Sequence, residues 1–155
     1  MRLKGSRALA CALLAASAAT FGFGAARTFA QGGAELKSAE FVSAAELKER
    51  LAKGEPVTLI DLRSADIYAS SDGKIAGALH IKERRLRART GLPPLRDLPR
   101  DAWVVTYCAC PSDEAAVRAA RTLSAAGFKR VRVLKGGWRA WLDARGPVEA
   151  KPRGM

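Results

Sequence analysis

The sequence predicts an α/β fold in which a small, mainly parallel β-sheet of four or five strands is flanked by helices on both faces. Short apolar, β-branched runs alternate with segments of helical period at close spacing, which is the pattern of strand–helix–strand units. The run at 103–107 (WVVTY) is apolar throughout rather than alternating, as expected of a strand buried on both faces. No internal repeat divides the 155 residues, so we expect one domain.

The first half of the chain supplies helix and strand signals in turn. Residues 43–46 (SAAE) form a capping box, which predicts a short helix that ends at Gly54. Residues 57–62 (VTLIDL) predict a buried strand, and residues 64–68 predict a helical turn. Residues 73–78 (GKIAGA) contain two glycines and are expected to form a loop.

The second half continues this alternation. Its predicted elements are, in chain order, a short strand at 78–81, a dense basic run at 82–89, a proline-rich connection at 91–99, the strand at 103–107, a helix over 113–126, a strand at 131–134 and, after a tight turn at 135–137, a helix over 138–144. The helix over 113–126 has its apolar residues at helical spacing, and it is followed by Gly127, a common helix stop.

Cys108 and Cys110 lie between the end of the predicted central strand and the start of the helix over 113–126. In an open α/β sheet ligands bind at this edge, and the free N–H groups of a helix start favour negative charge there. Thiolate is the reactive form of cysteine, and lowering its pKa by about two units makes thiolate the majority species at neutral pH. A buried, inert pair of cysteines is the alternative. A C-x-C pair in a turn, followed by Pro111 and Ser112, favours a chemical role instead.

The amino terminus has the features of a secretory signal peptide at 1–30. A basic segment, an uncharged apolar run at 8–19 and a small-residue ending at Ala30 follow one another. We therefore predict an exported, periplasmic protein, with an uncleaved membrane anchor as the alternative. The remaining chain divides into a polar tether at 31–38, the domain at 39–149 and a frayed tail at 150–155.

Charge and cysteine count narrow the possible functions. The formal net charge is +12, and removal of residues 1–30 takes away four basic and no acidic residues, which leaves +8. This excess of positive charge favours anionic ligands or an acidic partner. Nucleic acid is a poor candidate, because the protein is expected to be exported and its basic residues do not alternate with aromatic ones. Only two cysteines then remain, and His80 is the single histidine, so we expect at most one disulfide and no metal site. We also expect no cofactor, no membrane contact once the leader is cleaved, and a monomer.

Three further segments resemble landmarks of the rhodanese homology domain and occur in the same order. They are residues 60–63 (IDLR), 73–78 (GKIAGA) and 134–141 (LKGGWRAW), and the cysteine loop falls between the second and the third, where this family has its active site. The resemblance spans about residues 39–148. It implies a single-domain, rhodanese-like sulfurtransferase of the thiosulfate type. In such an enzyme the loop cysteine takes the outer sulfur of a donor, becomes a persulfide, and passes the sulfur to a thiol or cyanide acceptor.

The resemblance also assigns roles around the cysteines. Backbone N–H groups of the loop, helped by the helix dipole, would stabilise the anionic persulfide. The predicted substrate-binding residues are Ala109, Pro111, Ser112 and Asp113 of the loop, together with Arg63. The family often has a basic or hydroxyl residue at the sixth loop position, which is Asp113 counting from Cys108 and Ala115 counting from Cys110. Phosphatase-like relatives place arginine one residue later, where Glu114 or Ala116 stands here, and this argues against phosphate-ester chemistry.

The spacing leaves the nucleophile open between the two cysteines. The strand end favours Cys108, while the distance back from Leu123 and Gly127 favours Cys110. We take Cys108 as the nucleophile, and Cys110 as the alternative or as a resolving cysteine that attacks a persulfide and releases its sulfur. Two other functions remain open: a thiol–disulfide redox protein that uses the C-x-C pair, and a catalytically silent binding module with the same fold.

Several other polar and aromatic residues have structural explanations. We expect Asp61 and Arg63 to pair at the sheet end, and His80 to be a hydrogen-bonded strand histidine rather than a base. Trp138 and Trp141 are expected to pack in the core. The arginines of the basic run either flank the pocket and attract anions or form a solvated surface; they are Arg84, Arg85, Arg87 and Arg89.

Overall fold

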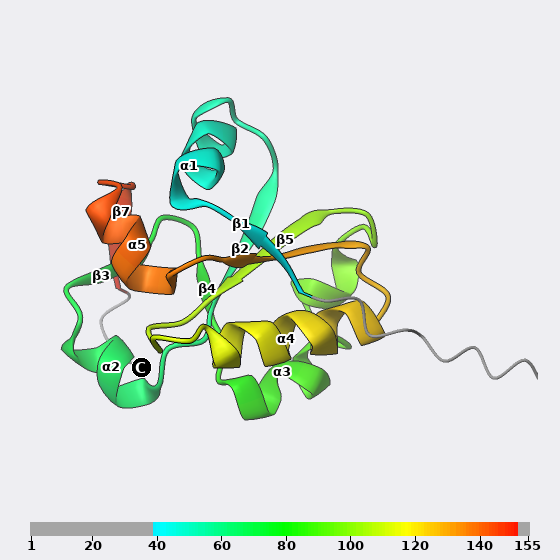
Figure 1. Ribbon diagram of the computed structural model, residues 1–155. Helices are drawn as coiled ribbons and strands as arrows, with labels where there is room; N and C mark the ends of the chain where they lie inside the picture. The colour runs from blue at the N-terminus through cyan, green and yellow to red at the C-terminus, as the bar shows by residue number, and fades with distance from the viewer. Residues whose placement is uncertain (1–38, 152–155) are drawn as a thin grey trace, which may run out of the picture. The chain divides into compact units, whose positions relative to one another are not determined.

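A five-stranded parallel sheet forms the centre of the domain. The computed structural model describes residues 39–151, so the predicted leader at 1–30 and tether at 31–38 lie outside the described residues. The strands are ordered β1 (Glu40–Val42), β6 (Arg130–Leu134), β5 (Trp103–Tyr107), β2 (Val57–Asp61) and β4 (Leu79–His80). Every neighbouring pair in this sheet is parallel, and β5 lies at its centre. The predicted α/β class is therefore confirmed (Figure 1).

Helices cover both faces of the sheet. α3 (Glu83–Arg89) and α4 (Glu114–Ala125) lie on one face, and α1 (Ala44–Ala52) and α5 (Gly137–Asp143) lie on the other (Figure 1). Successive residues of a strand point to opposite faces. Val104 accordingly packs with residues of α3 and α4, while Val105 packs with residues of α1 and α5. Within residues 39–151, no helix is long and apolar enough to cross a membrane.

Local sequence signals account for most of these elements. Ser43 caps the helix as predicted, because its side chain accepts a hydrogen bond from the Glu46 N–H at 3.1 Å, while the Glu46 carboxylate pairs with Arg50. The helical turn predicted at 64–68 is α2 (Ala65–Ser70), which Ser64 caps in the same way. Predicted and observed bounds of the main strands and helices differ by one residue or two at most, as is usual where elements fray.

Three short strands have no counterpart in the prediction. β3 (Gly73–Ile75) pairs antiparallel with β7 (Val148–Ala150) in a separate two-stranded sheet, and β1 joins the edge of the main sheet. The loop predicted at 73–78 is therefore wrong for its first three residues, and the predicted tail begins too early at 150. A strand of three residues is too short to show a clear hydrophobic period in the sequence. Its stability depends on the strand with which it pairs, which lies far away in the sequence.

The basic run folds as helix α3. One apolar residue, Leu86, anchors it, because this side chain is buried in the cluster shared with α4. The proline-rich connection that follows contains a short 3₁₀ helix, η1 (Leu95–Asp97), in which Leu95 is buried in the same cluster. The arginines of the run are exposed, so α3 presents a basic surface above an apolar contact.

A buried polar network fixes the carboxyl ends of β2 and β5. The side chains of Asp61 and Arg63 are both fully buried and form an ion pair at 2.6 Å, which confirms the predicted pairing. Arg63 also donates to the Gly73 carbonyl at 3.0 Å, and the Tyr107 hydroxyl donates to Asp61 at 2.8 Å. Burial, followed by the neighbouring Asp61 carboxylate, raises the pKa of Tyr107 well above its ordinary value. Removing Asp61 or Arg63 would leave the charge of the other buried and uncompensated, so the network holds the two strand ends and β3 together.

Candidate active site

The loop Cys108–Asp113 lies at the carboxyl edge of the sheet. It connects the end of β5 to the first residue of α4, Glu114, as the sequence predicted. Because all five strands are parallel, their carboxyl ends meet at this edge, where ligands bind in open α/β sheets. The structure therefore places both cysteines between the central strand and the amino end of a twelve-residue helix.

Asp113 closes the loop in an unexpected way. The sequence predicted a helix over 113–126, but α4 begins at Glu114, and the backbone of the preceding residue, Asp113, is left-handed at φ 54°. Its carboxylate does not cap its own helix; it accepts a hydrogen bond from the Gly136 N–H at 2.8 Å. The side chain is buried, and the second carboxylate oxygen has no hydrogen-bond partner within residues 39–151.

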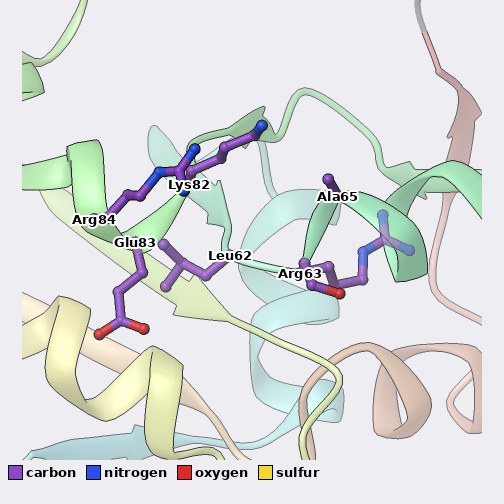
Figure 2. A pocket seen from close by; sticks show the side chains of 7 residues that line it. Leu62, Arg63, Ala65, Lys82, Glu83 and Arg84 are labelled. Atoms are coloured by element: carbon purple, nitrogen blue, oxygen red, sulfur yellow. The ribbon is translucent and has the colours of Figure 1, made fainter.

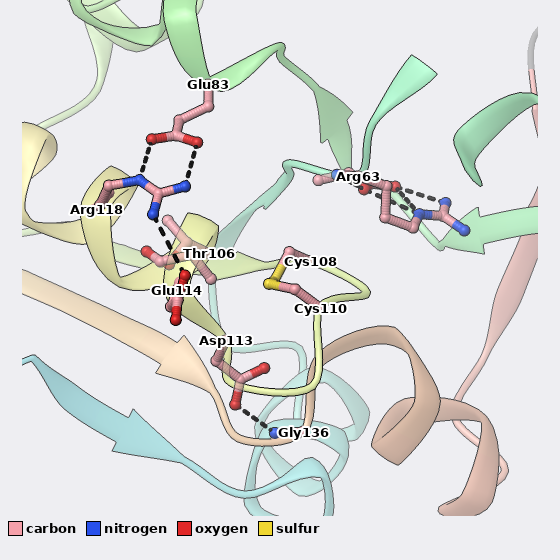
Figure 3. The surroundings of a disulfide bond; sticks show 11 residues. Arg63, Glu83, Thr106, Cys108, Cys110, Asp113, Glu114, Arg118 and Gly136 are labelled. Atoms are coloured by element: carbon pink, nitrogen blue, oxygen red, sulfur yellow. Dashed lines mark hydrogen bonds and ion pairs between the residues drawn. A yellow bond between two sulfur atoms is a disulfide. The ribbon is translucent and has the colours of Figure 1, made fainter. Parts of the chain in front are cut away.

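The first turn of α5, with its N-cap residue Gly136, also holds the opposite end of the same loop. The Trp138 N–H donates to the Cys108 carbonyl at 2.8 Å, so one turn binds the first and the last residue of the cysteine loop. Figure 3 shows the contact between Asp113 and Gly136 beside the two cysteines. Between the two donors lies Gly137, at φ 50°, where a Cβ would stand 2.1 Å from the Cys108 carbonyl oxygen. Only glycine allows this approach.

The two cysteines are joined by a disulfide within the loop (Figure 3). Their Cα atoms are 5.7 Å apart, a usual separation for a bridged pair. Cys108 is 2% exposed and packs in the apolar cluster with Leu62 and Ala116. Cys110 packs against the edge of that cluster and is partly exposed, so it is the more accessible residue of the pair.

Three backbone N–H groups of the loop have no backbone hydrogen-bond partner within residues 39–151. Asp113 N–H donates to the Cys110 carbonyl at 3.2 Å, and Pro111 has no N–H. Within residues 39–151, the backbone hydrogen bonds outside helices and strands do not use the N–H groups of Ala109, Cys110 or Ser112. These three donors, next to the start of α4, match the type of group that the predicted persulfide cradle requires.

A hollow of about 280 Å³ lies beside the strand that flanks the loop. Its lining residues are Leu62, Arg63, Ser64, Ala65, Lys82, Glu83 and Arg84 (Figure 2). Leu62 links the hollow to the cysteines, because its N–H donates to the Tyr107 carbonyl at 2.8 Å and its side chain packs in the cluster that contains Cys108. The hollow is therefore adjacent to the base of the loop.

The charges around this hollow are unequal. Lys82 and Arg84 are exposed, and within residues 39–151 neither forms an ion pair. Glu83 is neutralised by Arg118, which approaches it at 2.6 Å, and this hydrogen bond lowers the pKa of Glu83. Arg118 also lies 3.7 Å from Glu114, the first residue of α4 (Figure 3). The hollow therefore presents two uncompensated positive charges.

Arg63 and His80 have structural roles in this conformation. The Arg63 guanidinium is buried, binds Asp61, and lies 4.2 Å over the ring of Trp138. It is therefore committed to the network at the sheet end, and the predicted substrate contact would require it to leave Asp61. The His80 ring lies 3.0 Å from the Arg63 carbonyl and stacks on Tyr68 at 3.7 Å, as expected of a satisfied strand histidine.

Sequence reasoning missed the residues that position the loop. Gly136 and Trp138 act through their backbone N–H groups, and their contact with a loop more than 20 residues earlier leaves no local pattern. The pair of glycines at 136 and 137 was the available signal, since adjacent glycines often mark a close backbone approach. Lys82 was noted only as part of a basic run, without its place beside the hollow.

Comparison with known proteins gives consistent results. Residues 43–144 match the family model described as "Rhodanese-like domain". A protein of Allochromatium vinosum named "Sulfurtransferase" is 32% identical over 109 residues, which cover 70% of this chain and 94% of that protein. The crystal structure of the Alr3790 protein from Anabaena sp. has a TM-score of 0.60 at 35% identity, covering 71% of this chain and 82% of that one. A human single-domain sulfurtransferase has a TM-score of 0.57 at 26% identity, covering 68% and 96%.

The close approach at Gly137 predicts a large effect for a single methyl group. Gly137→Ala should lower the free energy of unfolding by about 1–2 kcal/mol, because alanine is strained in the left-handed backbone conformation. The clash of the new methyl group with the Cys108 carbonyl should lower it by about 1–3 kcal/mol more. Gly54→Ala is the matched control, because Gly54 has φ 71° and no atom within 4 Å of its Cβ position. Urea unfolding should show the larger loss for Gly137→Ala, and equal losses would contradict the close approach.

Proposed function

The chain belongs to the rhodanese-like domain family, and on that premise we propose that it is an exported sulfurtransferase that carries sulfane sulfur as a persulfide on Cys108. The acceptor would be a thiol or cyanide. Export is supported by the signal-like sequence at 1–30, and an amino terminus at Gln31 on periplasmic protein would test it. The relatives named sulfurtransferases support the reaction class.

The observation that carries the proposal is the place of Cys108. It directly follows the central strand, begins a loop held at both ends, and precedes the amino end of a twelve-residue helix. Free N–H groups and the helix dipole there favour an anionic sulfur. Cys110 lies two residues further along the loop, away from the strand end, so Cys108 is the better candidate for the nucleophile.

In the proposed reaction the disulfide is first reduced by two thiol groups, which are themselves oxidised to a disulfide. The Cys108 thiolate then attacks the outer sulfur of thiosulfate, the sulfur–sulfur bond of the donor breaks, and sulfite leaves with the bonding electrons. The loop N–H groups stabilise the negative charge of the resulting persulfide. An acceptor thiolate or cyanide takes the terminal sulfur and restores the Cys108 thiolate.

The donor's charge requires a cation that the loop does not contain. The sixth loop residue is Asp113, whose carboxylate is used to bind Gly136. Lys82 and Arg84, at the adjacent hollow, are the exposed cations suited to this task. They would attract a small dianion toward the loop through their combined field.

The disulfide favours a second candidate function. A protein whose Cys108–Cys110 bridge exchanges with partner thiols would need no sulfur donor and would use Cys110 as the exposed point of attack. The two functions differ in the covalent state that thiosulfate produces, since only the sulfurtransferase gains a sulfur atom.

Variants that lack one of the two loop cysteines, each in the chain with Cys11→Ser, test the assignment. After reduction and incubation with thiosulfate, Cys110→Ser should gain about 32 Da as a persulfide, whereas Cys108→Ser should gain nothing and should release no thiocyanate with cyanide. Intact-mass spectrometry and a thiocyanate assay are the measurements. If Cys108→Ser is active and Cys110→Ser is not, the nucleophile is Cys110. If neither variant takes up sulfur, the sulfurtransferase proposal fails and the redox function is favoured.

Removing the cations of the hollow should weaken donor binding. The variant Lys82→Ala/Arg84→Ala should raise the KM for thiosulfate about threefold to tenfold at low salt with little change in kcat, since it removes attraction rather than the nucleophile. Lys129→Ala/Arg130→Ala is the matched control. It removes the same charge from exposed residues at the amino end of β6, the opposite edge of the sheet. An equal rise in KM for both variants would assign the effect to net charge alone.

A further inference from the structure

We propose that Cys110 resolves the persulfide on Cys108, so that sulfur leaves as hydrosulfide and each turnover ends in the Cys108–Cys110 disulfide. This inference rests on the proposed function and names its acceptor. The electrons come from a dithiol that reduces the disulfide, rather than from a thiol that accepts the sulfur atom directly. Sulfur transfer and thiol–disulfide exchange, which were two alternative functions above, then become two steps of one reaction cycle.

The geometry of the loop allows this step without unfolding. The structure contains the bond between the two Sγ atoms while both ends of the loop are held by the Gly136–Trp138 turn. The disulfide-forming arrangement is therefore part of the folded domain. A neighbour in such contact has a very high effective concentration, so Cys110 should outcompete thiols from solution at millimolar concentration.

The proposed step balances without an outside oxidant. Cys110 gives its thiol proton to the terminal sulfur of the anionic persulfide, and its sulfur attacks Sγ of Cys108. The bond between that Sγ and the terminal sulfur breaks, and the terminal sulfur leaves with the electron pair as hydrosulfide. The terminal sulfur is thereby reduced and the Cys110 sulfur is oxidised, while the Cys108 sulfur keeps the oxidation state that it had in the persulfide. Attack on the terminal sulfur would only move the persulfide to Cys110, which leaves the oxidation state unchanged.

Exposure determines how the disulfide is reopened. Cys108 is 2% exposed and Cys110 is partly exposed, so an external thiolate attacks Cys110 and the Cys108 thiolate leaves. The second thiol of a dithiol then displaces Cys110 from the mixed disulfide. Over the cycle, thiosulfate and one dithiol yield sulfite, hydrosulfide and the oxidised dithiol. The nucleophile is regenerated as a thiolate in the position where the next donor reacts.

A single-turnover experiment tests this step. The full chain carries Cys11→Ser, so that Cys108 and Cys110 are its only cysteines. It is reduced, freed of reductant and mixed with one equivalent of thiosulfate. We expect about one hydrosulfide per chain, measured by monobromobimane trapping, and a loss of about 2 Da from the reduced mass, as a disulfide requires. The same chain with Cys110→Ser should release no hydrosulfide and should retain the added sulfur.

The outcomes separate this inference from the function on which it rests. If neither Cys110→Ser nor Cys108→Ser takes up sulfur, the proposed sulfurtransferase function fails, and if only Cys108→Ser does, the nucleophile is Cys110 and the resolving step is overturned. If Cys110→Ser takes up sulfur but the two-cysteine chain also keeps its persulfide and stays free of disulfide, only the resolving step is overturned. Equal hydrosulfide from both chains would likewise overturn it. In steady state, hydrosulfide release should be at least about tenfold faster with dithiothreitol than with a monothiol at equal thiol concentration, and equal rates would contradict the dithiol requirement.

Discussion

Two backbone N–H groups in one turn hold the cysteine loop at both of its ends. Trp138 donates to the Cys108 carbonyl and Gly136 donates to the Asp113 carboxylate, each at 2.8 Å. Gly137 lies between them, and its missing side chain allows the turn to approach the loop. These contacts determine where the chain leaves β5 and where α4 begins. The positions of Cys108 and Cys110, and the direction of the N–H groups between them, depend on this arrangement.

The rest of the carboxyl edge supports the same loop. The buried network of Asp61, Arg63 and Tyr107 holds the ends of β2 and β5, and Leu62 continues from it to the wall of the hollow. Buried charge is therefore used to fix strand ends, while the two exposed positive charges of the hollow lie on Lys82 and Arg84. This separation gives the site a rigid base and an attractive entrance for anions.

The sequence predicted those features that depend on local pattern. The apolar run at 103–107, the capping box at Ser43 and the stop at Gly127 each leave a signal within a few residues, and β5, α1 and α4 were located from them. Three-residue strands such as β3 and β7 were missed because their stability comes from partners more than 70 residues away. The role of Asp113 was missed for the same reason, since its partner Gly136 is 23 residues later. The C-x-C spacing allowed a disulfide but could not establish one.

Amide hydrogen exchange at Gly136 and Trp138 tests the central claim most directly. If their N–H groups bind the cysteine loop, both should exchange at least about a thousandfold more slowly than in an unstructured peptide, in the disulfide and the reduced protein alike. The Leu123 amide, in the buried face of α4, provides the internal reference for the folded domain. Exchange at peptide rates for Gly136 and Trp138 while Leu123 stays protected would show that the loop is not held, and would contradict this account.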